Sequence, residues 1–191
     1  MKNLAVFASG GGSNAQKIID YFGNHESIRV ALIVSNRADA GVIAIAQKHD
    51  IPFCIIQRNY FYDSENILAE LQQADIQHIA LAGFLWLIPA YLIQAFPNRI
   101  VNIHPALLPK YGGKGMHGTH VHEAVKAAAE TESGITIHEV NERYDEGKIL
   151  FQATRNIEAT DDVTTIAKKI LALEHTYFAQ VIETWMSQTD K

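Results

Sequence analysis

The 191-residue sequence contains one cysteine, Cys54, and it has no run of lysine or arginine. A single cysteine cannot form a disulfide within the chain, and its place in the apolar stretch 51–56 predicts a buried thiol in a reducing compartment. The formal net charge is -5, so the chain lacks the basic surface that nucleic-acid binding requires. A nucleic-acid partner is therefore disfavoured.

Long apolar runs are missing as well. The first one, residues 4–8, is too short for a signal peptide or a membrane span, which predicts a cytoplasmic protein with no membrane partner. The chain is 48% hydrophobic and 19% charged, a composition typical of a globular domain with a sizeable core. Since no repeat, low-complexity tract or linker divides it, we expect residues 1–191 to form a single domain. The domain is expected to be a monomer or a homodimer.

Short apolar runs alternate with stretches of helical periodicity. The expected strands are residues 4–8, 30–34, 53–56, 79–82 and 100–104, and the expected helices begin at residues 15, 41, 64 and 89. Strands separated by helix-length segments imply right-handed crossovers and a parallel sheet. We therefore predict an α/β fold, a Rossmann-like three-layer domain whose ligands bind at the carboxyl ends of the strands.

The last third of the chain should extend this sheet. Residues 134–140 and 149–153 alternate as strands, and the turn 141–147 between them predicts a hairpin. Asp145 in that turn precedes Gly147, so it is ordinarily interpreted as a turn residue. Residues 161–186 begin with acids and continue with helical periodicity, which predicts a long helix packed on the sheet.

The segment 100–109 contains two polar side chains in an apolar run. Asn102 and His104 alternate, so in a strand they project to the same face. Pro105 and Pro109 prevent the strand from continuing. A carboxamide and an imidazole at the end of a strand can stabilise an oxyanion and move a proton, which suits acyl transfer. The alternative, two buried residues that bind loop carbonyls, stays open on this segment alone.

A glycine-rich loop, residues 9–14, follows the first strand and opens a helix. Its free N–H groups and the positive end of the helix dipole favour an anion, which predicts a phosphate at Gly12, Ser13 and Asn14. Gly10, Gly12 and Ala15 also match the loose dinucleotide motif G-x-G-x-x-G/A. No acid stands at the end of the next strand to bind a ribose, so we favour a phosphomonoester over a dinucleotide, and a structural turn comes third.

Two further segments have open interpretations. Leu85, Trp86, Leu87 and Ile88 lie in an apolar loop that is either core or the lining of a slot for a flat heteroaromatic ligand. His117, His120 and His122 lie in or just after a glycine-rich segment that is typical of a mobile substrate loop. A zinc site there is disfavoured, because a closed zinc site needs four ligands and no cysteine or closely spaced carboxylate accompanies the histidines.

Four segments together resemble one enzyme family: SGGGSN after the first strand, LAGFLWLIP, NIHPALLPKY and ERYDEG. They resemble the glycinamide ribonucleotide transformylases, which are folate-dependent formyltransferases of purine synthesis, and the likeness runs through residues 3–185. NIHPALLP is shared with formyltransferases that act on methionyl-tRNA and amino sugars, so it indicates formyl transfer and not the acceptor. The resemblance implies the formyltransferase fold, with 10-formyltetrahydrofolate as co-substrate, glycinamide ribonucleotide as acceptor, and no metal.

The resemblance also implies residue roles. Asn102, His104 and Asp145 would be catalytic, and Glu174 would contact the glycinamide substrate. Gly12, Ser13 and Asn14 would hold the 5′-phosphate, and Leu85, Trp86, Leu87 and Ile88 would bind the folate together with Asn102. Formyl-folate hydrolysis, transfer to another amine such as an amino sugar, and a non-catalytic nucleotide-binding module remain the alternatives.

Overall fold

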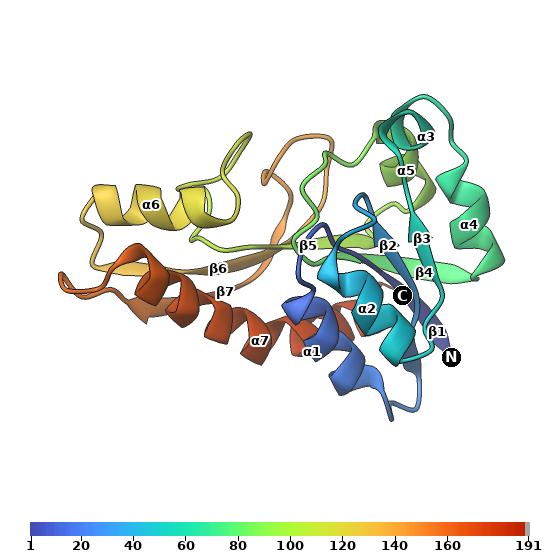
Figure 1. Cartoon of the computed structure of the whole chain (residues 1–191), viewed down its shortest axis with the longest axis horizontal. Helices are drawn as coiled ribbons and strands as arrows, with labels where there is room; N and C mark the ends of the chain where they lie inside the picture. The colour runs from blue at the N-terminus through green and yellow to red at the C-terminus, as the bar shows by residue number, and fades with distance from the viewer. Residues whose placement is uncertain (190–191) are drawn as a thin grey trace.

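A computed structural model describes residues 1–189 and contains one seven-stranded sheet, with strand order β3-β2-β1-β4-β5-β6-β7 (Figure 1). The strands are β1 (Lys2–Phe7), β2 (Ile28–Ser35), β3 (Phe53–Ile55), β4 (Ile76–Leu81), β5 (Ile100–His104), β6 (Glu132–Glu139) and β7 (Ile149–Asn156). Strands β1 to β5 pair in parallel, and β6 and β7 add an antiparallel hairpin beside β5. The predicted mainly parallel α/β sheet is therefore confirmed.

Helices cover both faces of the sheet. One face carries α1 (Ser13–Phe22), α2 (Gly41–Lys48) and α7 (Val163–Gln188), the other carries α3 (Arg58–Tyr62), α4 (Ile67–Gln73) and α5 (Ala90–Ala95), and α6 (Thr119–Ala127) packs beside α7 (Figure 1). Successive side chains of β1 point to opposite faces, so Leu4 and Val6 pack into one core, and Ala5 and Phe7 pack into the other. This is why a buried parallel strand is apolar throughout.

The sequence pattern did not predict α3. Its five residues are too few to show helical periodicity. Tertiary contacts stabilise it instead: Phe61 is fully buried, and the Tyr91 hydroxyl donates a hydrogen bond to the Phe61 carbonyl oxygen at 2.6 Å. Helix α3 thereby forms a wall beside the loop that follows β4.

Cys54 is less buried than predicted. It lies in β3, an edge strand of three residues whose flanking side chains, Phe53 and Ile55, are exposed. The thiol faces the core under α3 and α4 and is only partly covered. Burial still raises the pKa of the Cys54 thiol, and Glu70 adds to the effect.

The loops that follow β1 and β4 meet where the order of the strands reverses. The Ser9 backbone N–H donates to the Gly83 carbonyl oxygen at 3.1 Å, and the Leu85 N–H donates to the Ser9 hydroxyl at 3.0 Å. A crevice outside the carboxyl ends of the strands is expected at such a point. Within residues 1–189, no helix combines the length and the apolar character that crossing a membrane requires.

Candidate active site

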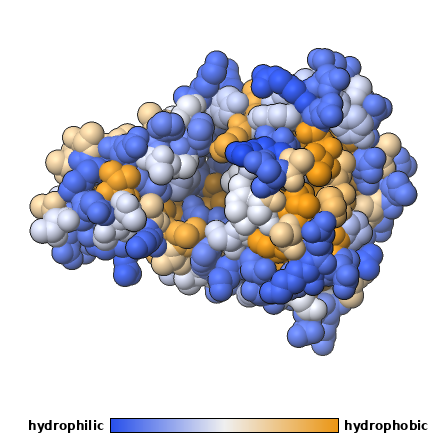
Figure 2. Space-filling view, viewed as in Figure 1, coloured by the Kyte–Doolittle hydropathy of each residue, from blue (hydrophilic) through white to orange (hydrophobic). Residues whose placement is uncertain are grey.

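A pocket of about 650 Å³ opens at the carboxyl ends of the strands, and most of the predicted site residues line it. Its lining includes Asn102, His104, Asp145, Glu174, Asn14 and the loop 85–88. Figure 2 shows the surface hollowed near the middle of this face, with apolar residues at the floor. Gly12 and Ser13 are outside the lining, immediately before Asn14. The carboxyl edge therefore brings together segments that are far apart in the sequence.

His104 is the last residue of β5, and the residue is 4% exposed. Its Nε2 lies 2.8 Å from the Tyr111 carbonyl oxygen. Because a carbonyl oxygen can only accept, Nε2 carries a proton. On the other side of the ring, Nδ1 lies 3.5 Å from Asp145 Oδ2. Two oxygen acceptors thus face the two ring nitrogens, and only an imidazolium has an N–H for each.

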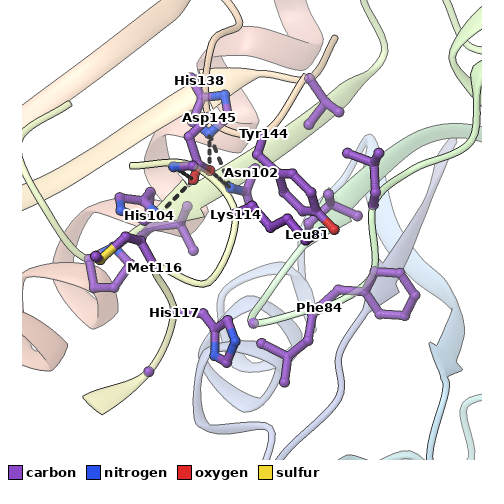
Figure 3. A pocket seen from close by; sticks show the side chains of 18 of the residues that line it. Leu81, Phe84, Asn102, His104, Lys114, Met116, His117, His138, Tyr144 and Asp145 are labelled. Atoms are coloured by element: carbon purple, nitrogen blue, oxygen red, sulfur yellow. Dashed lines mark hydrogen bonds and ion pairs between the residues drawn. The ribbon is translucent and has the colours of Figure 1, made fainter. Parts of the chain in front are cut away.

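Asp145 lies in the turn between β6 and β7, where its backbone is left-handed with φ 58°. The prediction of a turn residue is therefore correct for the backbone. Its side chain nevertheless points into the site, where Oδ2 accepts from the Gly113 N–H at 2.9 Å. Figure 3 shows the carboxylate between His104, Asn102 and His138. Asp145 is therefore both a turn residue and a neighbour of His104.

Burial and neighbouring charges have opposite effects on the pKa of His104, and also on the pKa of Asp145. Burial lowers the pKa of His104, and the charge of Asp145 and the Tyr111 carbonyl only partly offset it. Burial alone would raise the pKa of Asp145, but His138, the charge of His104 and the Gly113 N–H together hold it below its usual value. Asp145 is therefore ionised, and it raises the pKa of His104 above the value that burial alone would set.

His138 is a site residue that our sequence analysis did not identify. It lies directly opposite Asn102 in the β5–β6 register. Its Nδ1 lies 2.8 Å from the Glu139 carbonyl oxygen and so carries a proton, whereas Nε2 accepts from the Asn102 Nδ2 at 3.1 Å. The Asn102 Nδ2 also lies 3.5 Å from Asp145 Oδ1. The alternation of Thr136 and His138 in the predicted strand was the signal that could have identified it.

Thr136 holds the loop that follows β5. Its hydroxyl donates to the Ala106 carbonyl oxygen at 2.7 Å and accepts from the Leu108 N–H at 3.0 Å. The side chain of Gln152 in β7 donates to the same hydroxyl at 2.9 Å. The antiparallel hairpin therefore fixes the turn that ends β5 at His104.

The glycine loop leads into α1, which begins at Ser13, two residues earlier than predicted. Gly12 is left-handed with φ 80°, and a Cβ there would lie 2.9 Å from Val42 of α2. Glycine is therefore required by the backbone and by the packing of α1 on α2. Helix α1 has no side-chain cap and no acid in its first turn, so its first N–H groups remain suited to an anion.

Asn14 and Glu174 join α1 to α7 at one end of the pocket. The Asn14 Nδ2 donates to Glu174 Oε2 at 2.6 Å, and Glu174 is 9% exposed. Burial raises the pKa of Glu174, which the Asn14 hydrogen bond only partly offsets. The Asn14 Oδ1 is buried and has no partner within residues 1–189. This end of the pocket therefore has the Glu174 carboxyl group to accept from a ligand, beside a buried amide oxygen that lacks a partner.

The loop 85–88 lines the opposite part of the pocket. Ile88 is buried in the core under α3 to α5, whereas Leu85 is 46% exposed. Trp86 packs against Phe61 at 5.8 Å between ring centroids. The Leu87 carbonyl is not free to bind a ligand, because it accepts from the Tyr62 hydroxyl at 2.9 Å. The Leu85 N–H is also occupied, because it donates to the Ser9 hydroxyl.

The three histidines of the glycine-rich segment and α6 have different surroundings. His117 lines the pocket, and His120 pairs with Glu123 on the exposed face of α6. His122 is buried and also lines the pocket. No group of three or more histidine, cysteine, aspartate or glutamate side chains in the described part of the chain could hold a metal ion.

Comparison with known proteins shows which protein family the chain belongs to. Residues 2–182 match the family model described as formyl transferase, and the chain belongs to this family. A crystal structure of phosphoribosylglycinamide formyltransferase from Bacillus halodurans superposes with a TM-score of 0.88 at 33% identity, covering 98% of this chain and 97% of that one. The predicted fold is therefore confirmed.

Curated relatives have the same name as the protein in that crystal structure. Phosphoribosylglycinamide formyltransferase of Bacillus subtilis is 36% identical over 188 residues, which are 96% of this chain and 94% of the relative. The chloroplastic enzyme of Arabidopsis thaliana is 41% identical over 95% of this chain. The chain spans 64% of that relative's length, and 60% of the length of the Vigna unguiculata relative.

Proposed function

We propose that this protein transfers the formyl group of 10-formyltetrahydrofolate to the amine of glycinamide ribonucleotide. The observation that carries the proposal is the constellation of Asn102, His104 and Asp145 at the carboxyl end of β5, in a pocket with an anion-compatible helix start at one end. The names of the relatives support the same acceptor.

The apolar part of the pocket fits the folate. Its walls include Leu81, Phe84, Val140 and the loop 85–88, a lining that suits a flat heteroaromatic ring with polar edges. Formyl folate supplies an activated one-carbon unit on nitrogen. Trp86 and Ile88 orient the ring system, and Asn102 lies beside the position where the formyl group would reach β5.

The polar residues provide a proton and a hydrogen-bond donor. The Asn102 Nδ2 donates to the formyl oxygen as negative charge develops there. His104, as an imidazolium, stabilises that charge and gives a proton to the leaving nitrogen. Asp145 favours the charged ring, and the Tyr111 carbonyl accepts from Nε2, which leaves the Nδ1 side of the ring for proton transfer.

The acceptor lies toward α1 and α7 in this proposal. Gly12, Ser13 and Asn14 hold its 5′-phosphate at the start of α1. Glu174, which is bound to Asn14 at 2.6 Å, accepts from the hydroxyl or amide groups of the substrate. The acceptor amine faces the formyl carbon beside His104 and attacks it, and collapse of the tetrahedral intermediate breaks the bond between that carbon and the folate nitrogen. The amine loses one proton as the leaving nitrogen gains one from His104, so the imidazolium is restored.

One assay tests the function directly. Release of tetrahydrofolate from 10-formyltetrahydrofolate should require glycinamide ribonucleotide and should yield the formylated ribonucleotide. Release without any acceptor would indicate a hydrolase that uses water. Equal activity with an amino sugar would indicate a different acceptor, and no release with any amine would indicate a binding module.

The phosphate site is testable at Ser13, because a larger residue at Gly12 would also disturb α2. Ser13→Asp places a negative charge at the start of α1, which should stabilise the fold by about 0.3–1 kcal/mol through the helix dipole. The same charge should weaken binding of the ribonucleotide by about tenfold or more, through repulsion of the phosphate. Calorimetry with both ligands checks this. Equal loss for folate would contradict a phosphate site at this helix.

We also propose that residues 1–191 act as one domain, since all the strands of the described residues belong to a single sheet and the family model spans residues 2–182. Its small-molecule substrates are the ribonucleotide and the formyl folate. A cytoplasmic location, the absence of nucleic-acid and membrane partners, and the choice between monomer and homodimer stay predictions.

A further inference from the structure

His122 is a buried titratable residue to which the proposed mechanism assigns no task. It lies in the first half of α6, is 7% exposed and lines the pocket. His120 on the same helix provides a contrast, because its side chain is 62% exposed, pairs with Glu123 and does not line the pocket. The two histidines therefore share a helix but not an environment.

The ring of His122 lacks a partner that would fix its protonation. Its Nδ1 is buried and has no hydrogen-bond partner among residues 1–189. A buried N–H without a partner is rarer in proteins than a buried acceptor without one, so the proton of the neutral ring belongs on Nε2. Burial and the nearby charge of His104 both lower the pKa of His122. The ring is therefore neutral near pH 7, with an Nε2–H to donate.

The position of α6 assigns this donor to the acceptor end of the pocket. Helix α6 packs beside α7, and α7 contributes Ala167, Leu171 and Glu174 to the same lining. Glu174 is bound to Asn14 of α1, next to the proposed phosphate site. The loop 85–88, which would hold the folate, follows β4 and packs against the core under α3 to α5.

We infer that the Nε2–H of His122 donates a hydrogen bond to the carboxamide carbonyl oxygen of the acceptor. This inference rests on the proposed function. In an α-amino amide the carbonyl carbon is separated from the reacting amine by a single carbon. His122 lies close enough to His104 for the charge of His104 to act on it. Its Nε2–H can therefore bind this oxygen while the amine faces the formyl group. A neutral ring also suits an uncharged oxygen better than it suits a phosphate.

Two substitutions separate the hydrogen bond from packing. His122→Leu removes the donor and should weaken calorimetric binding of glycinamide ribonucleotide, without folate present, by about tenfold. His122→Gln keeps an amide N–H near the position of Nε2 and should stay within about threefold of the wild type. The Tm of the free His122→Leu protein should not fall, because no hydrogen bond within residues 1–189 is lost. His120→Leu is the matched control and should leave acceptor binding unchanged.

A modified ligand completes the test. An acceptor analogue with a methylene group in place of the carboxamide carbonyl should bind the wild type about tenfold more weakly, and His122→Leu should add no further loss. Additive losses, or wild-type affinity of His122→Leu for the natural acceptor, would overturn the inference while leaving formyl transfer intact. A wild-type protein that neither binds nor formylates the ribonucleotide would overturn the proposed function and this inference with it.

Discussion

Replacing Asp145 by asparagine is expected to reduce turnover by about 10²-fold or more, the usual contribution of general acid–base assistance. The substitution keeps the shape of the side chain but removes the charge that lies 3.5 Å from His104 Nδ1. Burial already lowers the pKa of His104. Without the carboxylate that pKa should fall further, so fewer molecules carry the imidazolium at neutral pH. Acceptor affinity should change little.

A double-mutant cycle distinguishes this role from that of a turn residue. His104→Ala should cost a similar factor in single-turnover rate, and the double variant should lose far less than the product of the two, since the residues act as one unit. An NMR titration of His104 in the wild type and in Asp145→Asn provides the independent measurement. Fully multiplicative losses together with an unchanged titration would leave Asp145 as a turn residue only.

Replacing Asn102 by leucine is expected to reduce turnover by about 10²–10³-fold, the cost of removing one oxyanion donor. Leucine has nearly the same shape, but it provides no N–H for the formyl oxygen and none for His138. The loss should appear in the rate at saturating substrate, because the bond to the oxygen strengthens only as charge develops. Single-turnover measurement with both substrates saturating checks this.

The alternative for Asn102 is a structural residue that binds His138 at 3.1 Å. In that case the leucine variant would lose thermal stability, and affinity for folate and acceptor would fall along with the rate. The variant His138→Gln keeps a partner for Asn102, because the glutamine side-chain oxygen can accept from the Asn102 amide in place of Nε2. Turnover of Asn102→Leu within about threefold of the wild type would contradict the donor role.

Local patterns in the sequence were sufficient to predict most of the sheet. Continuous apolar runs identified β1, β2 and β4, because a strand buried on both faces has no polar side. The spacing of the helical stretches then implied parallel pairing. The alternation of Asn102 and His104 placed both on one face of β5. The glycine loop predicted an anion site at the start of α1, and this stays a prediction. Each of these inferences depends only on residues that are close in the chain.

Tertiary structure alone decided which distant residues meet. Asp145 lies beside His104 because β6 and β7 fold back antiparallel along β5, and the Gly113 N–H fixes its carboxylate at 2.9 Å. His138 faces Asn102 because of the register between β5 and β6. The partial exposure of Cys54 follows from the place of β3 at the edge of the sheet. Strand order and register are set by packing over the whole sheet, so no local pattern contains them.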